Sequence, residues 1–244
     1  MYNSIHSEFI SSPLSYILAD GINASNCIGD GMETYPLCEY LLQSLFLKMT
    51  GAQEQKMKCI CWELASNDYE YRYDFLNKKN YGECSDYKSK NGVFNDLIMA
   101  IKKMDPFFII TNFIDNSLII NVKGEMERIL DHSNLSIWKS KEYVFYNNSI
   151  ANIIKDTQIG KCNEKSYPLF QSELMDNYTE IVYKHRNRCA HNTLSYQTNL
   201  PDLSTIASKN YDYHNYFVRF AILILIDVLF IKLYKYYLSL QNGN

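Results

Sequence analysis

The sequence predicts an all-α fold, and three of its features support this prediction. Apolar residues make up 47% of the 244-residue chain, which is enough to bury a substantial core. Glycine and proline are scarce, at 9 and 5 residues, and this scarcity argues against a turn-rich β-sandwich or β-barrel. Apolar residues also recur at helical spacing along much of the chain. We therefore expect one helical domain over residues 1–244.

The N-terminal part is expected to hold an arm followed by a helix. Residues 1–32 are interrupted at Pro13, so they form either a short helix or an irregular arm that wraps the core. Thr34 is a plausible N-cap, and Pro36 fits the first turn of the helix that follows. Glycine commonly stands just beyond the C-terminus of a helix, so we expect this helix to end at Gly51.

Two more helices are expected before residue 105. Residues 52–76 carry a buried stripe, and the short turn at Gly51 predicts an antiparallel hairpin with the preceding helix. Residues 77–92 are polar and read as a surface loop, and residues 93–104 form a short amphipathic helix.

The middle region, residues 105–166, is less defined. Residues 106–124 are rich in β-branched and aromatic side chains, which favours a strand by propensity. The same segment fits a buried helix, and we favour the helix because its neighbours are helical. Residues 125–166 hold short amphipathic pieces between polar turns. We treat this region as an insertion in the helical domain.

The chain is expected to close with a long helix over residues 211–240. Its centre is apolar on every side, which is typical of a helix buried in a core or in an oligomer interface. Arg219 and Lys232 bracket only about twelve residues, and Asp227 lies among them. A membrane span needs about 18–20 apolar residues, so no span is predicted. A peripheral membrane protein that uses this helix remains a weaker alternative.

Charge and cysteine content constrain the partners and cofactors. The net charge is −3 and the pI about 6.0, so any contact with RNA must rely on a local basic patch such as residues 184–188. The seven cysteines form no disulfide framework, and no secretory signal precedes them, which predicts reduced thiols and a cytoplasmic location. Cys59 and Cys61 form a single C-x-C pair, too few for a zinc site. No metal or other cofactor is expected.

Residues 167–192 are the most informative stretch. They predict one amphipathic helix, whose packing face holds Leu174, Tyr178, Ile181, Val182, His185 and Cys189. The opposite face holds Lys184, Asn187, Arg188 and His191, and Asn187 lies one turn from His191. Arg186 is about 140° away from His191 on a regular helix. The two side chains can converge if the helix ends near His191, or if two copies of the helix meet across a two-fold axis.

The sequence Arg186-Asn187-x-x-Ala190-His191 resembles the Arg-x(4–6)-His motif of the HEPN superfamily, a group of helical proteins that includes many metal-independent ribonucleases. The resemblance covers about 25 residues and extends loosely to the helical context. It implies a HEPN-like helical bundle, a homodimer with the catalytic cleft at its interface, and a final helix that supports this interface. It also implies a toxin or an effector of anti-phage defence, controlled by an antitoxin or a sensor protein. This chain departs from a minimal HEPN unit in being larger and acidic.

The chemistry of the motif suits RNA cleavage by the 2′-OH of the substrate. Histidine titrates near neutrality, so His191 is the expected acid and base. Arg186 is the expected phosphate clamp, because a guanidinium forks onto phosphate oxygens and stabilises the charge of the transition state. Asn187 is expected to orient the histidine or the phosphate. Lys184, His185 and Arg188 are expected to contact the RNA backbone. An endoribonuclease is therefore the predicted function.

The alternative to catalysis is a non-catalytic helical module that regulates a partner protein or nucleic acid. In that case Arg186 forms a salt bridge, and His191 caps the C-terminal end of its helix. Other residues are expected to have structural roles. Trp62 and Trp138 are expected to be packing residues, and a solvated acidic face is expected at Glu63, Glu70 and Asp74.

Overall fold

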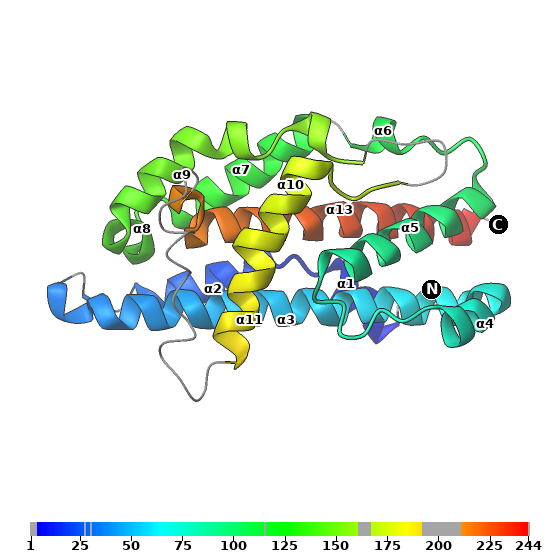
Figure 1. Ribbon diagram of the computed structural model, residues 1–244, viewed down its shortest axis with the longest axis horizontal. Helices are drawn as coiled ribbons and strands as arrows, with labels where there is room; N and C mark the ends of the chain where they lie inside the picture. The colour runs from blue at the N-terminus through cyan, green and yellow to red at the C-terminus, as the bar shows by residue number, and fades with distance from the viewer. Residues whose placement is uncertain are drawn as a thin grey trace.

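The described residues of the computed structural model form a helical bundle, which confirms the all-α prediction (Figure 1). The only β pairing among them is an isolated bridge between Ile159 and Phe170. The structure describes residues 4–26, 28–29, 31–114, 116–160, 167–191 and 211–243.

One long helix replaces the predicted hairpin around Gly51. α3 (Tyr35–Asn67) runs for 33 residues without interruption, so the predicted helix end at Gly51 is wrong. Buried side chains continue on both sides of the glycine, with Phe46 and Met49 before it and Met57 and Ile60 after it. Their burial outweighs the roughly 1 kcal/mol that a glycine costs in a helix interior relative to alanine. The chain turns later, at Asp68, which caps α4 (Tyr69–Lys78) by accepting a hydrogen bond from the Tyr71 N–H.

Gly51→Ala is expected to stabilise the protein by about 0.5–1 kcal/mol, because alanine has the higher helix propensity. A Cβ at this position meets no atom within 4 Å, so the substitution adds no clash. Chemical denaturation measures the change. Gly82→Ala is the matched control, because Gly82 has a φ of +50° and the same substitution there should destabilise the fold. Destabilisation by Gly51→Ala would contradict a continuous α3.

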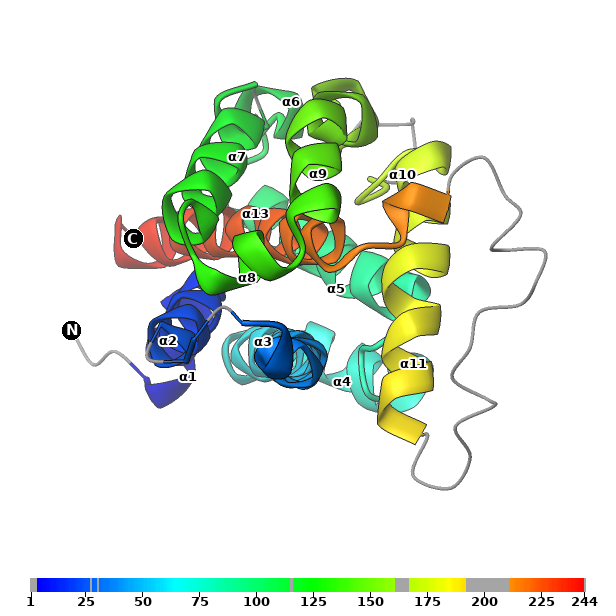
Figure 2. The ribbon, with the colours of Figure 1, turned by 90° about the vertical axis from the view of Figure 1, so that its left-hand side faces the viewer.

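The last helix forms the centre of the bundle. α13 (Tyr216–Gly243) lies between a layer with α1–α3 and a layer with α7–α9 (Figure 2). Its residues 220–226 are at most 1% exposed. The apolar faces of this part of the helix are therefore covered within one chain, and its support of a dimer interface stays a prediction. Among the described residues, no helix has the length and apolar character needed to cross a membrane.

A buried ion pair ties α13 to the N-terminal segment. Lys56 Nζ of α3 lies 2.6 Å from Asp227 Oδ1 of α13, and both side chains are at most 5% exposed. Asp227 Oδ2 also accepts the Leu14 N–H at 2.7 Å, and Lys56 donates to the Ser12 carbonyl. Ser12 and Leu14 lie between α1 (Ile5–Ser11) and α2 (Ser15–Ser25). The predicted N-terminal arm is thus a pair of short helices fixed to the core.

The middle region is helical rather than extended. After α5 (Tyr87–Met104), the chain forms four more helices between residues 110 and 153, and the ambiguous segment 106–124 becomes helix and loop. α5 itself begins six residues before the predicted start at residue 93, because Asp86 caps it by accepting the Ser89 N–H at 2.7 Å. The four helices are α6 (Ile110–Phe113), α7 (Asn116–Leu130), α8 (Asn134–Trp138) and α9 (Ser140–Ile153).

Candidate functional site

The motif helix consists of three joined segments rather than one regular helix. α10 (Ser172–Asn177) passes into a π-helical segment, Tyr178–Tyr183, and then into α11 (Lys184–His191). The helix begins at Ser172, later than the predicted start at residue 167. Within the π segment, the Ile181 carbonyl accepts a hydrogen bond at 2.9 Å from Nε of the buried Arg219 on α13. Single π-helical turns occur often near functional sites, and here the turn directly precedes the motif.

The predicted packing face is confirmed for its first four residues. Leu174, Tyr178, Ile181 and Val182 are each at most 2% exposed. Tyr178 also donates its hydroxyl proton to the Ser85 carbonyl at 2.8 Å, which ties the π segment to the loop between α4 and α5. α11 is therefore held in a fixed rotation about its axis, and Arg186 faces α3.

Arg186 pairs with a carboxylate that the sequence reasoning did not find. Its Nη2 lies 2.9 Å from Oε2 of Glu54 on α3, and its Nη1 donates to Oδ1 of Asn187 at 3.3 Å. The Glu54 side chain is 9% exposed and that of Arg186 is 20% exposed. Glu54 thus fixes one edge of the guanidinium. A guanidinium has five N–H donors, so others remain for a phosphate.

A second buried cation lies near this pair. Lys90 of α5 is 2% exposed, and its Nζ donates to the Cys84 carbonyl at 2.9 Å. Burial lowers the pKa of Lys90 to about 8, and the charge of Glu54 opposes this shift while that of Arg186 adds to it. Lys90 and Arg186 thus place two positive charges close to the Glu54 carboxylate.

The backbone of the motif is a regular helix. α11 is α-helical from Lys184 to His191, and the π segment lies before it. Positions 186 and 191 are therefore about 140° apart around the helix axis. Whether the helix ends near His191, as the first route to convergence requires, lies outside the described residues. The predicted proximity of the Asn187 and His191 side chains lies outside the described residues, because the His191 side chain is not among them.

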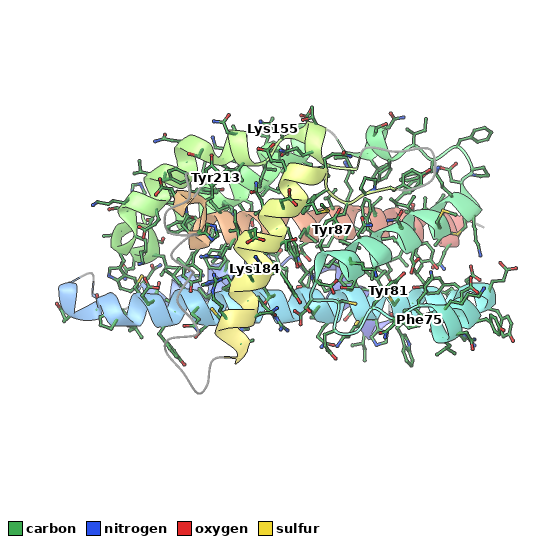
Figure 3. All side chains as sticks on the ribbon, in the orientation of Figure 1. Phe75, Tyr81, Tyr87, Lys155, Lys184 and Tyr213 are labelled. Atoms are coloured by element: carbon green, nitrogen blue, oxygen red, sulfur yellow. The ribbon has the colours of Figure 1, made fainter. Side chains whose placement is uncertain are left out.

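The residues that are predicted to contact the RNA backbone lie in different environments. Lys184 is exposed and pairs with Glu180 at 2.7 Å one turn earlier (Figure 3). Arg188 is partly buried, its Nη2 lies 3.5 Å from Nδ1 of His185, and its Nε has no hydrogen-bond partner among the described residues. Lys184 is the more accessible of these two cations, because both side chains of its ion pair are exposed to solvent. An ion pair that is exposed in this way is weak.

His185 is partly buried against aromatic side chains of the bundle. Its ring centroid lies 5.2 Å from that of Phe46 and 5.2 Å from that of Tyr216, and its Nε2 is 3.1 Å from the Tyr216 hydroxyl. Burial, together with the charges of Arg219 and Arg188, lowers the pKa of His185 to about 2. A charged contact between His185 and RNA does not fit this environment, so His185 is not part of the candidate site.

Cys189 and His185 form no reactive pair despite their proximity. Cys189 Sγ lies 3.5 Å from His185 Nε2. Burial raises the pKa of the Cys189 thiol, while the pKa of His185 is lowered, so both groups are neutral near pH 7. A nucleophilic cysteine needs a thiolate, and this pair does not supply one.

The burial of His185 should make the stability of the protein depend on pH. Unfolded His185 binds a proton below about pH 6.5 and folded His185 only below about pH 2, so the unfolding free energy falls as the pH drops below 6.5. We expect His185→Phe to remove about 1–2 kcal/mol of the loss seen between pH 7.5 and pH 5.0. Urea denaturation of both proteins at both pH values measures the difference. Parallel losses in the two proteins would contradict the lowered pKa.

The predicted acidic face is only partly correct. Glu70 and Asp74 are exposed, but the Glu63 side chain is 13% exposed and accepts a hydrogen bond from the Ser4 hydroxyl at 2.6 Å. Glu63 thus fastens α1 to α3 instead of facing solvent. Among the described residues, no group of three or more His, Cys, Asp or Glu side chains is arranged to hold a metal ion.

Comparison of the chain with protein-family models, curated proteins and solved structures found no match. The fold and the site geometry therefore define only a class, namely an all-α bundle with a partly buried arginine–carboxylate pair between α11 and α3.

Proposed function

We propose that this protein is a metal-independent endoribonuclease with a HEPN-like helical bundle. The observation that carries the proposal is the pairing of Arg186 with the buried Glu54 at 2.9 Å. This pairing fixes a guanidinium on α11, the helix that also carries His191. A preorganised cation of this kind stabilises the negative charge that develops on a phosphate during cleavage.

The proposed reaction uses the 2′-OH of RNA as the nucleophile. His191 acts as the acid or base of the reaction, by accepting the 2′-OH proton or by protonating the departing 5′-oxygen. The 2′-oxygen forms a bond to phosphorus while the bond from phosphorus to the 5′-oxygen breaks. The products are a 2′,3′-cyclic phosphate and a free 5′-OH, so atoms balance without water. Arg186 binds the non-bridging oxygens, and Asn187 orients the guanidinium through its Oδ1.

We propose further that the active form is a homodimer. Positions 186 and 191 lie about 140° apart around the axis of one α11. A second copy related by a two-fold axis can bring its own histidine to the phosphate held by the first arginine. Sedimentation velocity measures this directly. A monomer that cleaves RNA would contradict the shared site. In a cell, such a nuclease serves as a toxin or an anti-phage effector, controlled by an antitoxin or a sensor protein.

The experiment that tests the proposed function is cleavage of labelled RNA in excess EDTA by the wild type, Arg186→Ala and His191→Ala. We expect cleavage by the wild type alone. RNA that is substituted with 2′-O-methyl groups throughout is the matched substrate control, because it lacks the nucleophile. A pure wild-type protein that cleaves no RNA under any condition would contradict the proposal.

A second candidate is a non-catalytic module that regulates a partner protein or nucleic acid. The observation that favours it is the same ion pair, because Arg186 already has a carboxylate partner within its own chain. A structural role predicts that Arg186→Ala lowers stability and that the wild type lacks cleavage activity. The two candidates therefore differ in the wild-type assay, before any variant is made.

A further inference from the structure

An aromatic pocket with lysines at its rim lies beside the Glu54–Arg186 pair. Its volume is about 430 Å³, which falls within the range of small-ligand sites. The walls hold the aromatic rings of Trp62, Phe75 and Tyr81, together with Cys61, Ala65, Cys84 and Gly82. Lys58, Lys79 and Asn80 supply polar groups at its edge.

Trp62 is unusual for its exposure. Its side chain is expected to be a packing residue, but it is 64% exposed, so that prediction is wrong. One contact of the indole is with His6, in an edge-on arrangement with ring centroids 6.0 Å apart. Phe75 and Tyr81, by contrast, are fixed, since they pack edge-on at 5.9 Å and the Tyr81 hydroxyl donates to Asp96 at 2.8 Å. The pocket thus combines two rigid rings with an indole that solvent reaches.

The rim of the pocket can bind an anion. Lys58 pairs with Glu83, whose side chain is 73% exposed. An exposed ion pair contributes little, typically about 0–1 kcal/mol, so a phosphate can replace Glu83 as the partner of Lys58. Lys79 stays paired with Asp96 at 2.6 Å and lies over the ring of Tyr71, so its role is structural.

The pocket and the candidate site lie along the same helix. Glu54 and Lys58 are one turn apart on α3, and Trp62 follows one turn later. Eight residues separate Glu54 from Trp62, which corresponds to about 12 Å along the helix axis. α4, the segment 79–86 and α11 all lie on the same side of α3 (Figures 1 and 2). Phe75 and Tyr81, which are labelled in Figure 3, lie next to the C-terminal half of α3, past the point where α11 crosses this helix.

From this arrangement we infer that the pocket binds a nucleobase of the single-stranded RNA whose phosphate lies at Arg186. The base stacks on Trp62, and Lys58 contacts a phosphate between the pocket and Arg186. This inference rests on the proposed function for the identity of the ligand. Stacking on aromatic rings tolerates any base, so the pocket fixes the position of the strand rather than its sequence. It also explains how an acidic chain could hold RNA, through stacking together with a few local cations.

The experiment measures binding without cleavage, so it is independent of catalysis. The ligand is a 2′-O-methyl RNA decamer, which keeps bases and phosphates but cannot be cut. The protein carries Trp138→Phe, because the chain has two tryptophans and Trp62 then supplies all the indole fluorescence. This substitution also removes an indole N–H that is buried without a partner among the described residues. We expect the decamer to quench the fluorescence of Trp62 at saturation.

Fluorescence anisotropy of a labelled decamer then compares variants in the wild-type background. Trp62→Ala is expected to weaken binding about 10-fold, as the loss of one stacked base predicts. Tyr40→Ala is the matched control, because Tyr40 is an aromatic residue on α3, 70% exposed and outside the pocket. It should leave binding unchanged.

Three outcomes would overturn the inference. They are no quenching of Trp62, equal binding by Trp62→Ala and the wild type, or equal affinity for free AMP and the decamer, which would make the ligand a mononucleotide. Failure of the proposed function looks different, because the decamer would still bind through Trp62 while no RNA is cut in EDTA. Conversely, cleavage with Trp62-independent binding would refute only the pocket.

Discussion

Arg186→Ala is expected to reduce the rate of RNA cleavage about 10²–10³-fold, the usual loss when one preorganised charge-stabilising group is removed. The reason is geometric as well as electrostatic. Glu54 fixes the guanidinium through Nη2, so its remaining N–H groups are aimed before the substrate arrives. Alanine removes the charge and leaves Glu54 buried without its partner. The measurement is single-turnover cleavage of labelled RNA in EDTA, at a temperature where the variant remains folded by circular dichroism.

Arg186→Lys separates charge from geometry. Lysine keeps the positive charge next to Glu54 but lacks the planar fork that binds two phosphate oxygens. We expect the variant to fold like the wild type and to cleave RNA much more slowly. Lys184→Ala is the matched control on α11, since Lys184 is exposed and pairs only with Glu180. A small loss of RNA affinity is its expected effect. If Arg186→Ala cleaves RNA at the wild-type rate, Arg186 is a structural residue.

Asp227→Asn is expected to lower the free energy of unfolding by about 3–5 kcal/mol, the largest stability effect that the structure predicts. The substitution keeps the size of the side chain but leaves the Lys56 ammonium buried without a counter-ion. Lys56 and Asp227 are 5% and 2% exposed, so solvent cannot compensate. Burial already lowers the pKa of Lys56, and the charge of Asp227 opposes that shift. Guanidinium denaturation at pH 7 measures the loss.

An exposed ion pair provides the comparison for Asp227→Asn. Lys78 and Asp74 pair at 2.7 Å one turn apart on α4, and both side chains are largely exposed. Lys78→Ala should therefore change the free energy of unfolding by less than about 0.5 kcal/mol. Equal effects of the two substitutions would show that the Lys56–Asp227 pair is not desolvated, and that the N-terminal helices are not fixed to α13 through it.

Helical periodicity predicted the class of the fold because burial has the same period in the sequence as in the structure. The predicted helix boundaries were wrong where two local signals competed. Gly51 is a common helix-ending residue, but the apolar stripe of α3 continues beyond it, and tertiary packing decided the outcome. The apolar character of α13 predicted burial but not its location, because a core and a dimer interface have the same composition.

The candidate site, like the fold, was predicted only in part from the sequence. Arg186, Asn187 and His191 are close in sequence, so a local motif could identify them. Glu54 is 132 residues away from Arg186, and no local pattern links the two. One signal did exist, because Glu54 falls within the buried side of a helix, between Gln53 and Met57, where an acidic residue requires a partner. The π segment before α11 has no sequence signal that we can identify.

We propose that this chain cleaves RNA by attack of the 2′-OH without a metal ion. The most direct test is analysis of the RNA product ends after incubation with the wild type in excess EDTA. We expect fragments that end in a 2′,3′-cyclic phosphate and begin with a 5′-OH, and no such fragments with His191→Ala. Fragments that end in a 3′-OH, or cleavage that stops when EDTA is added, would contradict it.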